Sequence, residues 1–226
     1  MWTAISLWFV VGGGALAYVA WAVAQVGGGA PAWPFVVGLP LVYVALILFN
    51  TTIFFALAWW FRAQRPEHAR IDGLRTMRMV WDEFRTMAGS APRMMLYGLL
   101  VPDPAPAPAV LPVLLLHGVL CNAGVWTGMK RRLDAEGLGP VYALSYGPPL
   151  ASIELFADQV AAKVDGILAA TGARRVIIVG HSMGGLVARA YLRRHGSDRV
   201  ARVVTIGTPH AGSVHAWMFP GTSASG

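Results

Sequence analysis

The sequence predicts an α/β fold, in which a partial parallel sheet of about four strands with flanking helices follows a two-helix transmembrane hairpin. Three observations predict it. The first 61 residues contain no Asp, Glu, Lys, Arg or His. Strand-like and helix-like segments alternate from residue 110 onward, which favours parallel strands joined by right-handed crossovers. A serine flanked by glycines stands between one of these strands and the helix that follows it.

Charge is distributed unevenly along the 226 residues. Charged residues make up 13% of the chain, about half of the usual share, and all 29 of them (18 basic, 11 acidic) follow residue 61. Before that point, 45 of 61 residues are apolar. We therefore divide the chain into a hairpin (1–61), an amphipathic helix with a proline-rich linker (62–108) and the first part of a sheet domain (109–226).

The hairpin contains two segments long enough to cross a bilayer, which takes about 20 residues. They run from residue 1 to about 25 and from about 35 to 61, and a glycine-rich turn joins them. Trp59, Trp60 and Phe61 end the second segment at an aromatic belt. For the first segment, a cleaved signal peptide stays open as an alternative, although the chain lacks the basic start of such a peptide.

Arginines follow the second span closely, whereas the turn between the spans carries no charge. The positive-inside rule therefore places residues 62 onward in the cytoplasm, with both spans in the inner membrane and membrane lipids as partners. The net charge of +7 does not indicate nucleic-acid binding, because the basic residues form no motif interleaved with aromatics.

Residues 66–90 have apolar side chains at spacings of three and four, which predicts an amphipathic helix that Asp72 can cap. Whether this helix lies on the membrane surface or packs on the sheet domain stays open. Residues 102–108 alternate proline with other residues and predict a stiff, extended linker.

The sheet domain shows four strand-like and three helix-like segments. The strands are predicted at 110–116, 140–144, 175–179 and 200–206, and the helices at 126–136, 152–170 and 184–194. Gly172 is expected to end the second helix. Parallel sheets of this kind bind ligands at the carboxyl ends of their strands.

The sequence Gly180-His181-Ser182-Met183-Gly184 follows a strand and opens a helix. In this setting the serine is expected on a sharp, strained turn with its hydroxyl exposed, and the flanking glycines avoid collisions with neighbouring backbone. Ser182 is therefore the predicted nucleophile. The alternative of a nucleotide-binding turn has little support, because Gly-x-Gly-x-x-Gly is absent.

A second candidate motif, His117-Gly118-Val119, ends the first strand. The backbone amides of Val119 and Met183 are the predicted oxyanion hole. We expect His117 to be structural rather than a base. Cys121, the one cysteine, is expected to serve packing, and its being alone excludes a disulfide scaffold or a multi-cysteine metal site.

Three motifs in order carry a family resemblance: Leu-Leu-Leu-His117-Gly118, the six residues Gly180 to Gly185, and Gly207-Thr208-Pro209-His210, with Asn122 and Trp126 after the first. Together they make the chain, over about residues 110–215, resemble the α/β-hydrolase superfamily, specifically bacterial lipases and related esterases. The resemblance implies a serine ester hydrolase that acts on acyl esters without a metal or an organic cofactor. It also implies a structural role for His210.

The resemblance further implies an acid and then a histidine after the serine. After Ser182 the one carboxylate is Asp198, which precedes a strand, and the histidines are His195, His210 and His215. None fits well, so we expect an N-terminal portion of a longer hydrolase with little or no activity of its own. An acyltransferase or thioesterase with the same nucleophile and a non-catalytic membrane scaffold remain alternatives; the oligomeric state is not predicted.

Overall fold

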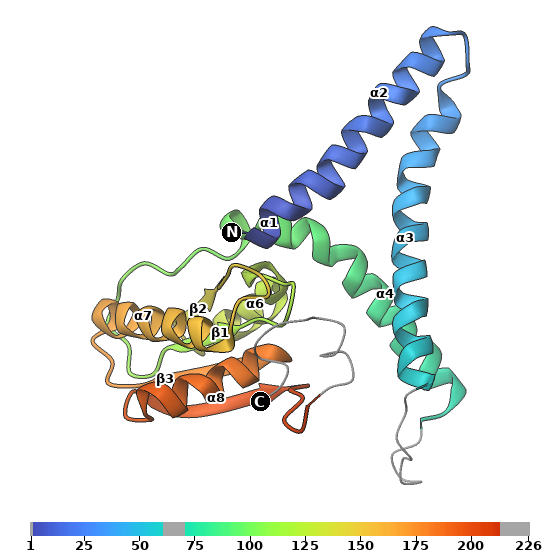
Figure 1. Ribbon diagram of the computed structural model, residues 1–226. Helices are drawn as coiled ribbons and strands as arrows, with labels where there is room; N and C mark the ends of the chain where they lie inside the picture. Colours follow the sequence, from blue (N-terminus) through green and yellow to red (C-terminus); the bar gives the residue numbers. More distant parts are fainter. Residues whose placement is uncertain (1, 61–70, 213–226) are drawn as a thin grey trace. The chain divides into compact units, whose positions relative to one another are not determined.

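A computed structural model describes residues 2–60 and 71–212, which form two compact units. One unit contains residues 8–60 and 71–92 and is helical; the other contains residues 2–7 and 93–212 and includes the sheet. Figure 1 shows the elements of both. The predicted α/β fold class is confirmed, with two apolar helices near the N-terminus.

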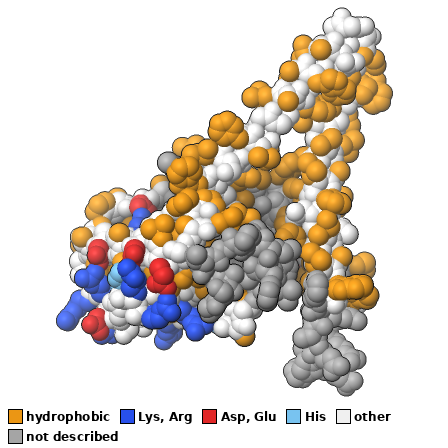
Figure 2. All heavy atoms as spheres, viewed as in Figure 1, with side chains coloured by type: hydrophobic (Ala, Val, Ile, Leu, Met, Phe, Trp, Pro, Cys, Tyr) orange, Lys and Arg blue, Asp and Glu red, His pale blue; other side chains and the backbone are white. Residues whose placement is uncertain are grey.

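The apolar helices are continuous over the lengths that a bilayer requires. The first runs through α1 (Trp2–Leu7), a π-helical turn η1 (Trp8–Gly12) and α2 (Gly13–Gly27), and the second is α3 (Trp33–Trp60). Both are long and apolar enough to cross a membrane, judged by length and composition alone. Most of their large side chains are exposed, and Figure 2 shows hydrophobic side chains along them.

Helix α4 (Gly73–Met95) begins where Asp72 accepts a hydrogen bond from the Arg75 N–H at 2.7 Å, so the predicted cap is confirmed. The helix extends past the predicted end at residue 90 and contains Pro92. A proline inside a helix leaves the carbonyl four residues earlier without its N–H donor. Here that carbonyl belongs to Ala88, and the Tyr43 hydroxyl of α3 donates to it at 2.6 Å.

This hydrogen bond also shows what α4 packs on within its own unit. A second contact joins the same two helices, since the Thr51 hydroxyl of α3 donates to the Met87 sulfur at 3.3 Å. The carboxyl-terminal half of α4 therefore lies against α3. Its amino-terminal half leaves Leu74, Met77 and Trp81 exposed.

The sheet has four parallel strands in the order β2-β1-β3-β4. They are β1 (Val113–Leu116), β2 (Val141–Leu144), β3 (Val176–His181) and β4 (Val200–Ile206). β1 is central and completely buried. It begins three residues later than predicted, because Val110 is 92% exposed and the ladder bonds begin at the Pro112 carbonyl, which accepts from the Ile177 N–H, and at the Val113 N–H, which donates to the Pro140 carbonyl.

Helices cover the sheet on both faces. The connecting helices are α6 (Thr127–Ala135), α7 (Ile153–Thr171) and α8 (Met183–His195), with short helices α5 (Tyr97–Leu100) and η3 (Ala123–Trp126). α7 and α8 pack together (Figure 1) and enclose the larger core with Leu114 and Ile178. The opposite face packs Leu115 and Val141 against Trp126 and residues of α6.

Local signals set the ends of α7 as the sequence predicts. The Ser152 hydroxyl accepts a hydrogen bond from the Leu155 N–H at 3.2 Å and caps the start. Gly172 adopts φ +67° at the end, a left-handed conformation that favours glycine. Because α7 runs antiparallel to the strands, its start lies at the carboxyl edge of the sheet, the edge that carries the candidate site.

Candidate active site

Ser182 lies in the sharp turn between β3 and α8. Its backbone has φ +53° and ψ −123°, a conformation that a side chain other than glycine rarely adopts and that stores strain. Two hydrogen bonds hold this turn: the Ser182 N–H donates to the Ile206 carbonyl at 2.9 Å, and the Ser182 carbonyl accepts from the Gly185 N–H at 3.1 Å. The nucleophile predicted from the motif therefore has the backbone that the motif requires.

The glycines of the motif are required by close approach of backbone. A Cβ atom added at Gly180 would lie 2.6 Å from the backbone of Gly184, and one added at Gly184 would lie 2.7 Å from the His117 carbonyl oxygen. Both distances are shorter than real Cβ contacts. The start of α8 is therefore pressed against the ends of β3 and β1, which brings the turn after β1 to the serine.

That turn, residues 117–120, is the candidate oxyanion loop. A Cβ atom on Gly118 would lie 3.2 Å from the Cβ atom of Ser182, so the loop and the serine are in contact. The Val119 N–H donates to no backbone acceptor in the described part of the chain. The Met183 N–H opens α8 and has no acceptor within the helix. The N–H groups of Val119 and Met183 thus have no backbone acceptor among the described residues, and their role as an oxyanion hole stays a prediction.

His117 is buried, with 2% of its surface exposed. Its Nδ1 atom lies 2.8 Å from the Gly118 carbonyl oxygen, so Nδ1 must carry the proton. Burial lowers the pKa of His117 to about 4, which keeps the imidazole neutral at neutral pH. Its Nε2 atom is buried and has no partner in the structure. These features fit the structural role expected from the sequence and not that of a base.

Tyr146, which the sequence analysis missed, adjoins the same loop. Its ring stacks on the His117 imidazole with centroids 4.0 Å apart, and its hydroxyl donates to the His117 carbonyl oxygen. Its position two residues after β2, at the carboxyl edge of the sheet, was the available signal. It could not be used, because the order of the strands was unknown from the sequence.

Asn122 and Trp126 support the oxyanion loop from the other side. The Asn122 side chain accepts from the Gly124 N–H at 2.9 Å and donates to the Met94 carbonyl at 2.8 Å. Trp126 is buried and presents its ring edge-on to His181, the exposed residue before the nucleophile, at 6.3 Å. The loop is thus built on a rigid base. Cys121, which directly follows the loop, accepts a hydrogen bond at its carbonyl from the Thr3 hydroxyl.

The Thr208-Pro209-His210 motif follows β4. His210 lies between the Arg189 guanidinium, 3.3 Å from Nδ1, and the Thr205 hydroxyl, 3.1 Å from Nε2. Thr208 packs against Gly185, near the start of α8. With both ring nitrogens engaged, His210 holds the segment after β4 onto α8, which agrees with the structural role that the resemblance implies.

The other titratable candidates lie elsewhere. His195 is at the far end of α8 and contacts Asp158 of α7, with Nε2 and the carboxylate oxygen 2.9 Å apart. Asp198 accepts a hydrogen bond from Arg175 at its carbonyl, at the amino edge of β3 and β4. His215 falls outside the described residues. Within residues 2–60 and 71–212, no histidine–carboxylate pair contacts Ser182, and no cluster of three metal-ligating side chains is present.

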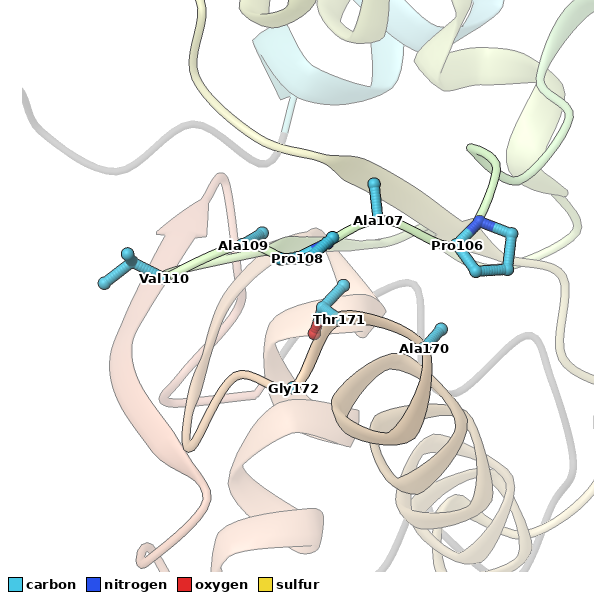
Figure 3. Close-up of a pocket in the computed structure, with 8 residues that line it drawn as sticks. All are labelled: Pro106, Ala107, Pro108, Ala109, Val110, Ala170, Thr171 and Gly172. Carbon is cyan, nitrogen blue, oxygen red and sulfur yellow. The ribbon is translucent and has the colours of Figure 1, made fainter.

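A hollow of about 540 Å³ lies at the opposite edge of the sheet (Figure 3). The linker residues Pro106 to Val110 and the end of α7 line it, and the Ala109 N–H donates to the Thr171 carbonyl there. Its eight lining residues include no titratable side chain. Because the strands point away from this edge, the hollow is separate from the candidate site.

The chain is similar in sequence to known proteins. Residues 112–225 match the alpha/beta hydrolase fold family, and the chain belongs to that family. It is similar to a triacylglycerol lipase of Pseudarthrobacter phenanthrenivorans, 36% identical over 118 residues, covering 46% of this chain and 35% of that lipase. A triacylglycerol lipase of Vibrio cholerae is 34% identical over 120 residues, covering 51% and 38%.

Among solved structures, the mature lipase BlEst2 of Bacillus licheniformis is 26% identical, with a TM-score of 0.45, covering 51% of this chain and 49% of that one. The chain spans about a third of the length of the curated relatives that it matches. The match of residues 112–225 establishes the alpha/beta hydrolase family for the sheet unit. What the whole protein acts on is a matter for proposal.

Proposed function

We propose that this chain carries the nucleophile and the oxyanion hole of a membrane-anchored serine hydrolase of carboxylic esters. The observation that carries the proposal is the backbone of Ser182, held at φ +53° between a strand and a helix. In the proposed site this backbone presents the hydroxyl at the carboxyl edge of the sheet, where the Val119 and Met183 amides would receive the oxyanion. The similarity of the sheet domain to triacylglycerol lipases supports an ester as the substrate.

The proposed reaction has two steps. The Ser182 oxygen attacks the ester carbonyl carbon, and the two amides donate hydrogen bonds to the oxyanion that forms. The carbon–oxygen bond to the alcohol then breaks, and the alcohol leaves with the proton that the serine gave up. Water attacks the acyl-serine in the second step and releases the carboxylic acid.

Both steps need a base: in the first it accepts the serine proton and gives it to the leaving alcohol, and in the second it accepts a proton from the attacking water and returns it to the serine oxygen. No such group contacts Ser182 in residues 2–60 and 71–212. We therefore propose that this chain alone turns over esters slowly or not at all. Loss of a triad member typically costs several orders of magnitude in rate.

Acyl lipids are the proposed substrates. The two apolar helices can each span a bilayer by length and composition, and the exposed Leu74, Met77 and Trp81 of α4 lie among arginines that attract anionic headgroups. Under the positive-inside rule, the sheet unit would lie on the cytoplasmic side of the inner membrane. A membrane position would give the nucleophile access to esters that are insoluble in water.

Two other functions use the same parts. An acyltransferase or thioesterase would form the same acyl-serine and differ in the acceptor or in the leaving group. A non-catalytic membrane scaffold is the different class, and the lack of a histidine–carboxylate pair at Ser182 in the described residues is the observation that supports it. The serine's own reactivity separates the enzyme from the scaffold.

The test is labelling of the full 226-residue chain, in detergent micelles, with a fluorescent fluorophosphonate. This probe forms its adduct with a nucleophilic serine and needs no deacylation, so it reports on the first step alone. Because no base contacts Ser182 in the described residues, we expect slow labelling of the wild-type chain and loss of that labelling in Ser182→Ala. Ser197→Ala, which removes an exposed serine after α8, is the matched control and should keep wild-type labelling.

The outcomes separate the proposals. Labelling that survives Ser182→Ala refutes the nucleophile assignment. A folded wild-type chain that is not labelled at all favours the scaffold. Labelled wild type that transfers an acyl group to an added alcohol or thiol faster than to water favours the acyltransferase.

A further inference from the structure

Tyr146 and His117, the first residue of the candidate oxyanion loop, form a buried pair. The two rings are nearly parallel, with 15° between their planes and centroids 4.0 Å apart. Tyr146 is 6% exposed and His117 is 2% exposed. The Tyr146 ring also contacts Phe156 of α7, with centroids 4.8 Å apart. The tyrosine is therefore fixed to the core on one side and holds the imidazole on the other.

The hydrogen bonds of this pair run along the backbone of the loop. The Tyr146 hydroxyl donates to the His117 carbonyl oxygen, which fixes the peptide plane between His117 and Gly118. The His117 Nδ1–H donates to the Gly118 carbonyl oxygen at 2.8 Å, which fixes the next peptide plane. A peptide group is planar, so the Gly118 carbonyl and the Val119 N–H belong to one rigid unit and point in opposite directions. A hydrogen bond that fixes the direction of the Gly118 carbonyl therefore also fixes the direction of the Val119 N–H.

Only one neutral tautomer of His117 can make this contact. A carbonyl oxygen accepts and cannot donate, so Nδ1 must carry a proton, and the neutral ring then leaves Nε2 bare. Nε2 is buried without a partner, so a second proton would enter a place with no acceptor. Burial lowers the pKa of His117 to about 4, consistent with a ring that stays in the single tautomer that the loop requires.

We propose that Tyr146 is a positioning residue for the reaction, which aims the Val119 N–H at the developing oxyanion through the His117 imidazole and carbonyl. This inference rests on the proposed function, in which Ser182 is the nucleophile. Tyr146 does not touch the reacting atoms. Its effect is to make the oxyanion hole rigid before the substrate arrives, which is the source of the rate gain from such donors.

The test compares two probes that differ at one atom. Organophosphorus fluorides with a P=O group place an oxygen in the oxyanion hole, whereas the matched P=S probes place a sulfur there. Sulfur is a weak hydrogen-bond acceptor, so the aim of the Val119 N–H matters for the first probe and little for the second. The ratio of the two Ser182 labelling rate constants therefore reports on the oxyanion donors and not on general packing.

The variant is Tyr146→Phe in the full chain, which removes the hydroxyl and keeps the ring stack. We expect its P=O labelling rate to fall by about tenfold, less than the full loss of a donor, with the P=S rate within about twofold of wild type. Tyr142→Phe is the matched control, because Tyr142 is a buried tyrosine of β2 whose hydroxyl has no partner. It should keep both rates.

Tyr146→Leu, which also removes the stack, should lower the P=O rate further. Equal falls in both rates for Tyr146→Phe, or no fall in either, overturn the inference while leaving Ser182 as the nucleophile. A wild-type chain that neither probe labels overturns the proposed function and, with it, the role of Tyr146. Circular dichroism of each variant verifies that the sheet unit is folded.

Discussion

Leucines have opposite surroundings in the two parts of this chain. Leu115 of β1 is completely buried, whereas Leu46 of α3 is 61% exposed. The same contrast holds for larger side chains, since Trp126 is 5% exposed and Trp60 is 75% exposed. The sheet unit thus builds its own apolar interior. The helices from residue 2 to 60 leave most of their large apolar side chains exposed, and they are long and apolar enough to cross a membrane by length and composition alone.

Charged side chains are distributed in the opposite way to exposed apolar ones. Figure 2 shows them gathered over the sheet unit, while the two long helices carry none. On α7 and α8 they form exposed pairs, such as Arg194 with Asp158 at 2.7 Å. High apolar content therefore accompanies two different patterns in one sequence: a buried core under a charged surface in the sheet unit, and long helices with exposed apolar side chains and no charge.

Truncating a leucine in each region should give the largest effect. Leu115→Ala should lower the free energy of unfolding of the sheet unit by about 4 kcal/mol, because it leaves a cavity in the center of the sheet. Leu46→Ala should leave that free energy unchanged within about 0.5 kcal/mol. Pulse proteolysis of the full chain in a urea series, followed on the sheet-unit fragments, measures both. Similar losses for the two variants would contradict the assignment of separate environments.

Acid should destabilise the sheet unit through its one completely buried imidazole among the described residues. The folded-state pKa of His117 is about 4, below its ordinary value of 6.5. Since the unfolded chain binds the proton more tightly, this stabilisation is complete above about pH 6.5 and is lost as the pH falls toward 4. The expected total is at most about 3 kcal/mol.

Urea denaturation between pH 7 and 4 measures this loss. His117→Gln should reduce the change in the free energy of unfolding between pH 7 and 4. His210→Gln, which changes an exposed histidine, should leave that change as in the wild type. A wild-type curve that does not change over this range would show that His117 is not held neutral. The hairpin helices have no titratable side chain between residues 2 and 60 other than tyrosine, so they should contribute nothing to the curve.

The smallest effect should come from surface ion pairs. Arg132 and Glu136 on α6 lie 3.0 Å apart, with side chains 80% and 55% exposed. Arg132→Ala should cost less than about 0.5 kcal/mol, because water and salt screen the pair. The same urea series at low and at high salt measures it. A loss above about 1 kcal/mol would mean that the charges of this unit do more than keep it soluble.

Predictions from the sequence were most accurate where local patterns suffice. β4 has the predicted bounds, Gly172 ends α7, and the strand–turn–helix around Ser182 follows from the spacing of its glycines. Bounds moved where nonlocal contacts decide them. β1 is shorter because the ladder to β2 and β3 begins only at Pro112 and Val113. α4 continues past residue 90 and through Pro92, where the Tyr43 hydroxyl donates to the Ala88 carbonyl in place of the N–H that proline lacks.

The sequence by itself locates the charge-free apolar segment before residue 62 and predicts Ser182 as the nucleophile, because both depend on composition and on short spacings. Only the tertiary structure decided the strand order β2-β1-β3-β4. That order places the end of β2 beside the end of β1, and so brings Tyr146 under His117. The two residues are 29 apart in the chain, and no periodicity links them. Their contact follows from hydrogen bonding between strands, which a linear pattern does not encode.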